Sequence, residues 1–217
     1  MIIDPKNQTR EQILHFANFN NRKVLEIGCG DGHTTRQLVD QAAEFIAIDP
    51  DPESISKAKE SLFGVDFRVG SGEDLEFLNN SFDVVLFTKS LHHQNGPQAL
   101  IETSRVLREG GQVLVVEPAV DGNLSDICNL FDDETSVLTS AVEAMDNSHF
   151  KVVYREEFDT NWVFENKQEF YNWLFDYYDM PYDESKIKQV NQLLGSKQHS
   201  SPLVLVHKLI ITTLTNH

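Results

Sequence analysis

Short apolar runs alternate with amphipathic stretches along the first half of the chain. Strands are predicted at the apolar runs 23–27, 45–49, 66–69, 82–88 and 112–117. Helices are predicted at about 33–42, 53–62 and 97–107, after a first amphipathic segment at 9–19. Strands that alternate with helices are typical of a parallel sheet. The pattern therefore predicts an α/β fold.

The residues that flank two of these helices agree with their predicted ends. Asp51 can cap the helix at 53–62, with Pro52 in its first turn. Pro97 can open the helix at 97–107, and the pair Gly110 and Gly111 can end it.

The pattern changes after Glu117. A polar, partly helical segment at 121–147 precedes the strand-like stretch FKVVYREEF, and PLVLVHKLIITTL is predicted as a last strand. Between them, the mostly helical stretch 162–178 carries eight aromatic residues, namely Trp162, Phe164, Phe170, Tyr171, Trp173, Phe175, Tyr177 and Tyr178. Such a cluster either forms a wall or lid over a substrate, or fills a core or a dimer interface.

Length and charge narrow the class of protein. A chain of 217 residues without a linker is expected to form one domain, 1–217. The formal charge of -16 disfavours a polyphosphate partner, because no stripe of Lys and Arg offsets it. No apolar run approaches the roughly 18 residues that span a bilayer, and the first residues, MIIDPKNQTR, lack a signal-peptide core. We expect a soluble cytoplasmic protein, monomeric or homodimeric, that binds a small molecule and neither nucleic acid nor membrane.

The two cysteines do not suggest a disulfide framework or a zinc site. Cys29 lies in a glycine-rich turn and Cys128 is far from it in the sequence. We expect both to be reduced thiols. The sequence also lacks a cluster of Asp and Asn suited to magnesium, so no metal is expected.

The stretch VLEIGCGDGHTTRQL, residues 24–38, has the form of a ligand-binding turn. Its apolar run contains Glu26, and Gly28, Gly30 and Gly32 follow at every second position before a helical pattern. Glycines let the backbone approach a ligand closely, and the helix behind them offers unpaired N–H groups. The dinucleotide fingerprint G-x-G-x-x-G would need a glycine where His33 stands, so the pattern is a different one.

Polar residues also follow the other predicted strands. The second strand ends at Asp49, whose carboxylate can accept hydrogen bonds from both hydroxyls of a ribose. The third leads into GSGEDLEF, which places Ser71, Gly72 and Glu73 at the same sheet edge, and the fourth brings Thr88, Lys89, His92 and His93 there. A nucleoside is therefore expected at this edge.

At these residues the sequence resembles the class I S-adenosylmethionine-dependent methyltransferases. Within that class it is similar to the methyltransferase type 11 group, which includes the ubiquinone/menaquinone C-methyltransferases. The resemblance rests on five ordered segments between residues 24 and 118: VLEIGCGDG, IDPDPESISKAK, GSGEDLEFLNNSFDVV, SLHH and VLREGGQVLVVEP.

The resemblance implies a Rossmann-like, doubly wound and mostly parallel sheet of seven strands, with the last strand antiparallel. It implies a cofactor-binding half at 22–118. The resemblance covers no more of 119–217 than a closing pair of strands, and we expect this part to be the substrate-side half, with a helical insertion or lid at about 159–201, because its segments follow or connect strands near the active edge. The resemblance implies S-adenosyl-L-methionine as the cofactor and S-adenosyl-L-homocysteine as the product. The cofactor-binding positions carried over from the family are Glu26, Gly28, Gly30, Asp31, Gly32, Asp49, Pro50, Ser71, Gly72, Glu73 and Thr88.

Among these, Gly28, Gly30 and Asp31 would pass the methionine part, with Glu26 supporting its ammonium group. Asp49 would bind the ribose. Ser71, Gly72 and Glu73 would border the adenine, although many relatives carry an acid or amide where Ser71 stands. Thr88 would close the site.

Three residues after these strands are candidates for a general base: His92, His93 and Glu117. The alternative is structural, because a histidine pair can pack against a cofactor and Glu117 can cap the turn that follows it. The segment FTKS does not resemble the NPPY type with which some relatives hold a planar amine. We therefore predict a methyltransferase that acts on a small molecule by in-line transfer.

Two alternatives belong to other classes. A non-catalytic partner or sensor that binds S-adenosylmethionine or its product would keep the same binding motifs, so only turnover separates it from an enzyme. A nicotinamide-dependent oxidoreductase would share the fold, but His33 argues against it.

Overall fold

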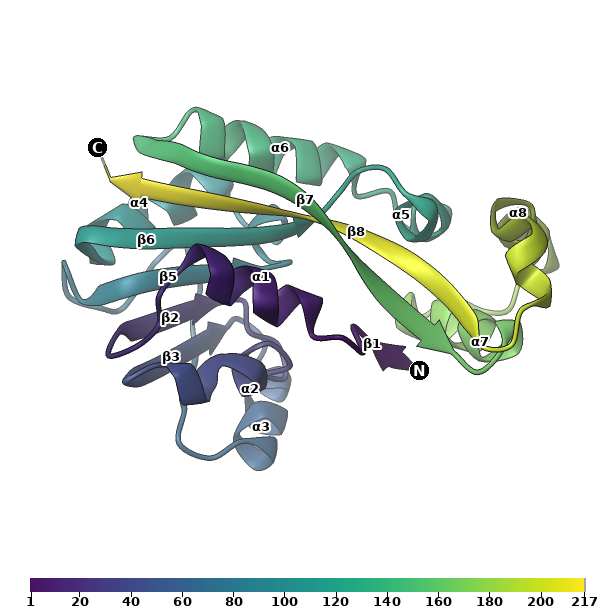
Figure 1. Cartoon of the computed structure of the whole chain (residues 1–217), viewed down its shortest axis with the longest axis horizontal. Coiled ribbons are helices and arrows are strands. Elements are labelled where there is room, and N and C mark those ends of the chain that lie inside the picture. Colours follow the sequence, from purple (N-terminus) through teal and green to yellow (C-terminus); the bar gives the residue numbers. More distant parts are fainter. Residues whose placement is uncertain (217) are drawn as a thin grey trace. The chain divides into compact units, whose positions relative to one another are not determined.

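The computed structural model describes residues 1–216 (Figure 1). In that part of the chain, eight strands form one sheet in the order β1-β7-β8-β6-β5-β2-β3-β4. The strands are β1 (Ile2–Ile3), β2 (Lys23–Ile27), β3 (Glu44–Asp49), β4 (Asp66–Val69), β5 (Phe82–Thr88), β6 (Leu107–Pro118), β7 (Phe150–Phe164) and β8 (Leu203–Asn216). The sheet has one strand more than predicted, because the two residues of β1 pair with β7.

Helices follow most of these strands. The α-helices are α1 (Gln8–Phe16), α2 (Thr35–Leu38), α3 (Pro52–Ser61), α4 (Gly96–Val106), α5 (Asn123–Cys128), α6 (Thr135–Asp146), α7 (Lys167–Tyr177) and α8 (Glu184–Leu194), and the 3-10 helices are η1 (Val39–Gln41), η2 (Leu91–His93) and η3 (Gly195–His199). Helices α7 and α8 lie between β7 and β8 in the chain. No helix within residues 1–216 combines the length and apolar character needed to cross a membrane.

The central strands confirm the predicted α/β fold with a mostly parallel sheet and an antiparallel last strand. The pairs β3 with β4, β2 with β3, β2 with β5 and β5 with β6 are all parallel. Strand β8 runs in the opposite direction to its neighbours β6 and β7, as the arrows in Figure 1 show. The carboxyl ends of β2 to β5 therefore meet at one edge of the sheet.

The fourth helix ends within one residue of its predicted end, but the prediction that Gly110 and Gly111 end it was wrong. Helix α4 ends at Val106, and Gly110 and Gly111 lie in β6, which begins at Leu107. Leu107 pairs with Phe82, but Gln112 pairs with Val84, so the residues between are an irregularity in the strand. The glycines serve there because Gly110 has a φ of +73°, a conformation that other residues rarely adopt.

Two other boundaries also differ from the predictions. The helix expected at 33–42 begins only at Thr35, because Gly32, at a φ of +82°, is part of a turn that continues to Thr34. It is also divided into α2 and η1. Trp162 and Phe164, expected in a mostly helical stretch, belong to β7. The cap of α3 is confirmed, because the Asp51 carboxylate accepts hydrogen bonds from the Glu53 and Ser54 amides at 3.1 Å.

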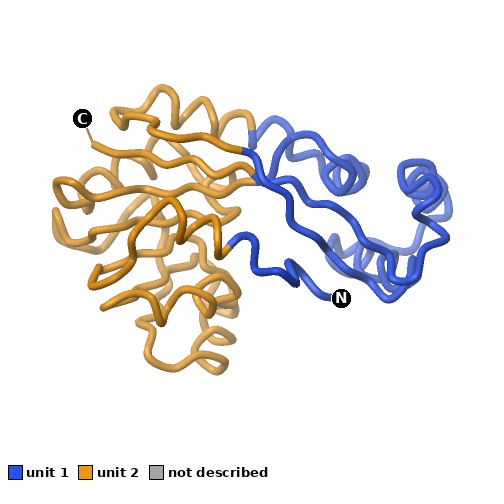
Figure 2. Tube along the Cα trace, viewed as in Figure 1, with its two compact units in different colours: residues 1–9, 118–138, 157–209 blue, residues 10–117, 139–156, 210–217 orange. Residues whose placement is uncertain are grey.

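The chain divides into two compact units, coloured separately in Figure 2. The larger unit comprises residues 10–117, 139–156 and those from 210 onward, and the smaller unit comprises 1–9, 118–138 and 157–209. Each has a hydrophobic core of its own, described next. The single domain predicted for 1–217 stays a prediction.

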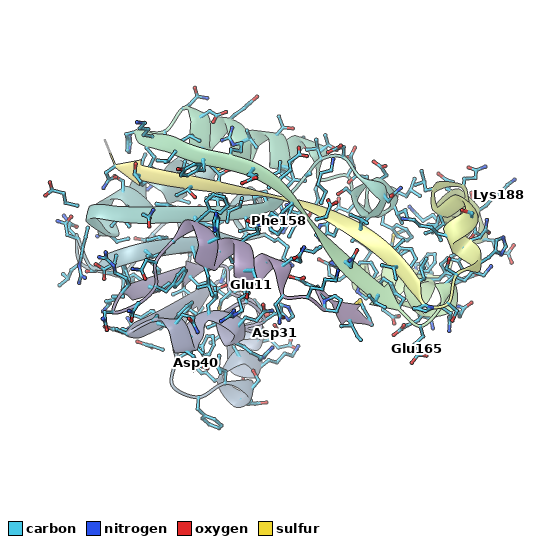
Figure 3. The ribbon with its side chains drawn as sticks, in the orientation of Figure 1. Glu11, Asp31, Asp40, Phe158, Glu165 and Lys188 are labelled. Atoms are coloured by element: carbon cyan, nitrogen blue, oxygen red, sulfur yellow. The ribbon has the colours of Figure 1, made fainter. Side chains whose placement is uncertain are left out.

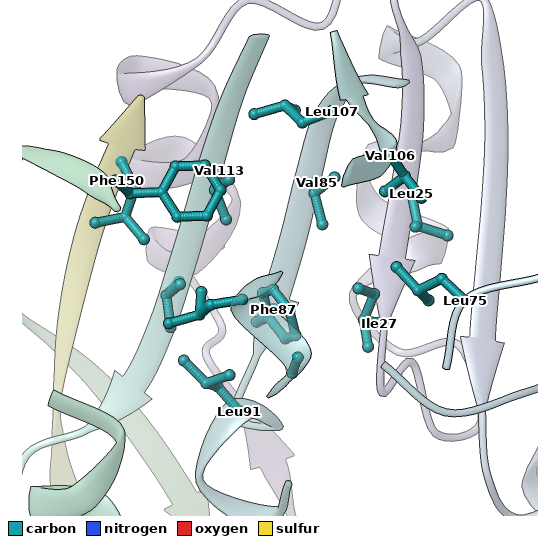
Figure 4. Packing of buried hydrophobic residues seen from close by; sticks show 14 of the residues in the cluster. Leu25, Ile27, Leu75, Val85, Phe87, Leu91, Val106, Leu107, Val113 and Phe150 are labelled. Carbon is teal, nitrogen blue, oxygen red and sulfur yellow. The ribbon is translucent and has the colours of Figure 1, made fainter. Parts of the chain in front are cut away.

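One hydrophobic cluster of the larger unit lies on one face of the parallel strands, and the residues between its members on those strands are buried on the opposite face. Alternate residues of β2, β5 and β6 point to the face of this cluster and meet side chains of α4 and α6; the cluster includes Leu25, Ile27, Val85, Phe87, Val113, Val115, Ala99, Leu100, Ala141 and Met145. Figure 4 shows part of this packing around Phe87 and Leu91. Alternation with a period of two is what a strand requires, and here it anchors the strand ends that carry the candidate site.

The core of the smaller unit contains most of the aromatic segment. Phe164 and Phe170 are fully buried, and Trp162 and Trp173 pack against them with residues of α5, α8 and β8. The Phe170 and Trp173 rings are stacked at 6.0 Å. These aromatics fill a core, and Tyr177, which is 67 % exposed, is the exception. Side chains on the surface of this unit include Glu165 and Lys188, labelled in Figure 3.

Candidate active site

A cavity of about 300 Å³ lies in the larger unit, where the loops that follow β2, β3, β4 and β5 meet. Half of the predicted site residues line it, namely Gly28, Gly30, Asp49, Pro50, Ser71, Gly72 and His93. Because parallel strands present their carboxyl ends on one side, residues distant in the sequence converge there. The structure thus brings together the segments on which the cofactor prediction depends.

The other half of the predicted residues do not line the cavity: Glu26, Asp31, Gly32, Glu73, Thr88, His92 and Glu117. Asp31, labelled in Figure 3, is exposed in the turn after β2. Glu73 is also exposed, and its carboxylate accepts a hydrogen bond from the Asn95 amide at 2.8 Å. Thr88 is buried, and its hydroxyl has no hydrogen-bond partner among the described residues.

Gly28 can only be a glycine in this arrangement. Its φ is +76°, and a Cβ atom built there would lie 2.3 Å from the Cβ of Ser90. Ser90 is held in place because its hydroxyl donates to the carbonyl of Ile27 at 2.6 Å. The glycine turn after β2 and the segment after β5 are therefore in direct contact. Because Gly28 has no side chain, the backbone of the turn itself lines the cavity.

The Asp49 carboxylate fixes the same turn from the neighbouring strand. One oxygen accepts the amide of Gly30 at 2.7 Å, and the other accepts the amide of Asp51 at 3.0 Å. A carboxylate offers about four acceptor positions, so two bonds leave capacity for a ligand. Asp49 lines the cavity, and this capacity suits the two hydroxyls of a ribose.

Glu26 lies one residue before the turn and is fully buried. One carboxyl oxygen accepts the Thr35 hydroxyl at 2.5 Å, and the other has no partner among the described residues. Burial, reinforced by the charge of Asp49, raises the pKa of Glu26 to about 8, although the Thr35 hydroxyl opposes the shift. A buried carboxyl with an unpaired oxygen fits a cationic group such as an amino-acid ammonium.

His92 and Glu117 form a buried pair at the ends of η2 and β6. The Nδ1 atom of His92 lies 2.6 Å from Oε2 of Glu117. The other Glu117 oxygen accepts the amides of Leu91 at 2.8 Å and His92 at 3.3 Å. Both carboxylate oxygens are thus occupied, and Glu117 holds the His92 ring in a fixed orientation. The ring of His93, which lines the cavity, lies 3.9 Å from that of His92.

Burial also affects the thiols. Burial, together with the charges of Glu26 and Asp49, raises the pKa of Cys29, and burial raises the pKa of Cys128 to about 11. Both cysteines are free. At neutral pH the two thiols are therefore protonated, which makes them poor nucleophiles.

Five lining residues were not among the predicted site residues: Ile27, Gly70, Lys89, Ser90 and Gln94. Lys89 and Ser90 follow β5 directly, and Gln94 comes right after the histidine pair. Their position after a strand at the expected edge was a usable signal. The packing of Ser90 against Gly28 and of Gln94 against Gly72 gave no such signal, because it depends on contacts between distant segments.

Comparison with known proteins agrees with this geometry. Residues 25–115 match the family described as a methyltransferase domain. An uncharacterized methyltransferase of Mycobacterium tuberculosis is 34% identical over 95 residues, which cover 44% of this chain and 39% of that protein. The region from Leu25 to Val115 is therefore similar to a methyltransferase domain.

Other relatives extend the comparison. The ubiquinone biosynthesis O-methyltransferase of Xanthomonas oryzae pv. oryzae is 36% identical over 99 residues, 43% of this chain and 41% of that protein. The chain spans less than half the length of the curated relatives it matches. The YcgJ protein of Bacillus subtilis has the same fold, with a TM-score of 0.66 at 20% identity over 95% of this chain and 97% of that one.

The match to a methyltransferase domain implies S-adenosyl-L-methionine as the methyl donor. Two features of the site fit the chemical groups of that compound. The unpaired oxygen of Glu26 suits its ammonium group, and the free acceptor capacity of Asp49 suits its ribose. The matched region includes both residues and the histidine pair, and it ends two residues before Glu117.

Proposed function

We propose that this chain is an S-adenosylmethionine-dependent methyltransferase that methylates a small-molecule acceptor. The observation that carries the proposal is the convergence of Gly28, Asp49 and the Ser71–Gly72 backbone on one cavity. Binding a nucleoside with an attached amino acid requires a bare backbone turn, a ribose acceptor and a base pocket together.

The residue roles form part of this proposal. Gly28, Gly30, Asp31 and Gly32 form the turn that the methionine part passes, and Glu26 supports its ammonium. Asp49 and Pro50 hold the ribose side, and Ser71, Gly72 and Glu73 border the adenine. Thr88 closes the site toward the sheet. Glu73 acts from outside the cavity, where its carboxylate fixes the Asn95 amide.

The reaction places few chemical demands on the protein. The bound cofactor supplies a methyl group that is already activated on a sulfonium. The chain's own residues align the acceptor with that methyl and exclude water, and alignment alone can contribute about 7 to 11 kcal/mol. An acceptor that carries a proton also needs a general base, which contributes roughly 10² to 10⁴ in rate.

His92 and His93 are the proposed sources of that base. His93 lines the cavity. Because Nδ1 of His92 contacts the Glu117 carboxylate, the Nε2 atom of His92 points away from Glu117. A carboxylate at Nδ1 fixes the tautomer and stabilises the ring when it takes up a proton. Glu117 is thus a positioning residue, since both of its oxygens are occupied.

The choice of a small acceptor rests on the net charge of this chain and on the name of one similar protein. A formal charge of -16 repels a nucleic-acid backbone. The similar protein of Xanthomonas oryzae is named for ubiquinone biosynthesis, and a quinol precursor is a small molecule. We also propose that the chain acts as a single domain, in the cytoplasm, as a monomer or homodimer.

The test is a calorimetric titration with S-adenosylmethionine, S-adenosylhomocysteine and NAD. Micromolar binding of the first two without NAD is expected, and binding of NAD alone would make the oxidoreductase alternative correct. Release of S-adenosylhomocysteine is then measured with quinols, catechols, amines and thiols, and with total tRNA. Turnover of tRNA alone would contradict the small-molecule assignment. Binding without turnover of any acceptor would favour the sensor alternative.

A further inference from the structure

Gln94 lies where two loops of the cavity meet. It follows η2 and lines the cavity beside Ser71 and Gly72. Its Nε2 atom donates to the Ser90 carbonyl at 3.0 Å, and Ser90 in turn donates to the carbonyl of Ile27. The side chain therefore links the first glycine turn to the loop that follows β4.

The carbonyl end of this amide has no hydrogen-bond partner within residues 1–216. Because Nε2 is occupied by Ser90, the oxygen Oε1 is the end that faces Gly72, and a Cβ atom at Gly72 would lie 2.2 Å from it. Oε1 is buried and has no hydrogen-bond partner in the part of the chain that the structure describes. A buried amide oxygen without a donor costs free energy, which a ligand donor would recover.

Two other side-chain acceptors near this loop already accept hydrogen bonds from the backbone. The hydroxyl oxygen of Ser71 accepts the amide of Glu73 at 3.2 Å. The Glu73 carboxylate accepts the amide of Asn95, and its side chain does not line the cavity. Asp49, at the end of β3, is the group that suits the ribose. Gln94 is thus the lining side chain with an unused acceptor next to the Ser71–Gly72 loop.

We propose that Gln94 selects the purine by accepting a hydrogen bond from the exocyclic 6-amino group of adenine. The inference rests on the proposed function, because it assigns a residue to the base end of that cofactor site. The terminal torsion of glutamine is soft, so a small rotation turns Oε1 from the Gly72 backbone toward a base seated there. A 6-oxo purine offers an acceptor at this position, and two facing acceptors repel each other.

The test compares two ligands on three proteins by calorimetry. The ligands are S-adenosyl-L-homocysteine and S-inosyl-L-homocysteine, which carries oxygen in place of the 6-amino group. The proteins are the natural chain, Gln94→Met and Gln98→Met. Gln98 is a matched control because it donates to the Glu73 carbonyl at 3.3 Å without lining the cavity. Thermal unfolding shows that each variant is folded.

The natural chain and Gln98→Met should prefer the adenosyl ligand by about tenfold or more. Gln94→Met should bind the adenosyl ligand about tenfold more weakly and the inosyl ligand within about twofold of the natural chain, so the preference largely disappears. An unchanged preference in Gln94→Met, whether or not both affinities fall, would overturn the inference. If the natural chain binds neither ligand, the proposed function itself fails, and this result is distinguishable from the others.

Discussion

The carboxylate of Asp49 accepts a hydrogen bond from the amide of Gly30 at 2.7 Å, which ties the end of β3 to the glycine turn after β2. The two residues stand 19 positions apart in the chain. Their contact places the acid at the cavity and fixes the turn with the same side chain. A ligand held by Asp49 is therefore also positioned against the bare backbone of the turn.

Asp49→Ala should weaken the binding of S-adenosylhomocysteine by about 1 to 3 kcal/mol, because a charged acceptor is lost. The dissociation constant is measured by calorimetry. Asp51→Ala is the control, since Asp51 caps α3 and contacts Asp49 only through its backbone amide. That variant should lose about 1 kcal/mol of stability and keep its affinity. Equal affinities for all three proteins would contradict the ribose assignment.

Glu26 should release a proton when the cofactor binds. Its pKa of about 8 means that the carboxyl is mostly protonated at pH 7, and a bound ammonium would favour the ionised form. Titrations at pH 7 in buffers of different ionisation enthalpy should show the release of close to one proton. Glu26→Gln should show none. Equal proton release by the two proteins would place the ammonium elsewhere.

The same group makes stability depend on pH. The pKa of Glu26 is raised from 4.5 to about 8 in the folded chain, so the folded chain keeps a proton that the unfolded chain loses. The stability that the protonated Glu26 contributes to the folded chain is fully present below about pH 4.5, and it is lost as the pH rises through about 8. The natural chain should therefore become less stable than Glu26→Gln as the pH rises from about 4.5 to 8, and the difference between their unfolding free energies should grow over this range. A pH-independent difference would contradict the raised pKa.

Glu117→Gln should lower turnover while leaving the affinity for S-adenosylhomocysteine within about twofold. An amide cannot accept from all three donors that Glu117 now satisfies, and it no longer stabilises a protonated His92. We expect kcat to fall roughly tenfold to a hundredfold, and the acid limb of the pH–rate profile to move to lower pH. Glu109→Gln, on an exposed position of β6, is the control. A fall in kcat without a shifted profile would make Glu117 purely structural.

Gly28→Ala should destabilise the chain by about 2 to 4 kcal/mol, because the new Cβ would meet Ser90 and strain the backbone. Gly30→Ala should cost only about 1 kcal/mol, since φ is +54° there but no atom lies within 4 Å of a built Cβ. Adding Ser90→Gly to Gly28→Ala removes the clashing atoms and should recover about 1 to 2 kcal/mol relative to additivity. Urea unfolding measures each value. Strict additivity would show that the turn relaxes away from Ser90.

Phe170→Ala should destabilise the smaller unit by about 3 to 5 kcal/mol, because the ring is fully buried against Phe164 and Trp173. Both tryptophans of the chain, Trp162 and Trp173, belong to that unit, so their fluorescence follows its unfolding. Gln168→Ala, exposed on the same helix, should change stability by less than about 0.5 kcal/mol. Coincident fluorescence and circular dichroism transitions would support the single domain, and separate transitions would contradict it.

The sequence by itself determined the parallel core and the location of the cofactor site. Strands β2 and β5 occupy the predicted residues, because buried strands of a parallel sheet are continuous apolar runs with polar ends. Strand β4 also occupies its predicted residues, although Phe67 is the one buried residue among its four. The residues after those ends reach one edge whatever the details of packing. Gly28, Asp49 and Gly72 could be named for that reason.

Only the tertiary structure decided how side chains from distant segments meet. The end of α4 could not be predicted from its glycines, because Gly110 and Gly111 serve an irregularity in the pairing of β6 with β5. The aromatic segment gave no local sign of whether it covers a substrate or fills a core, and the packing of Phe170 against Phe164 decided that. Likewise, the bond of Glu117 to His92 and the contact of Gln94 with Gly72 join residues from different loops. Local pattern specifies where a strand ends, but contacts between strand ends form only when the whole sheet is assembled.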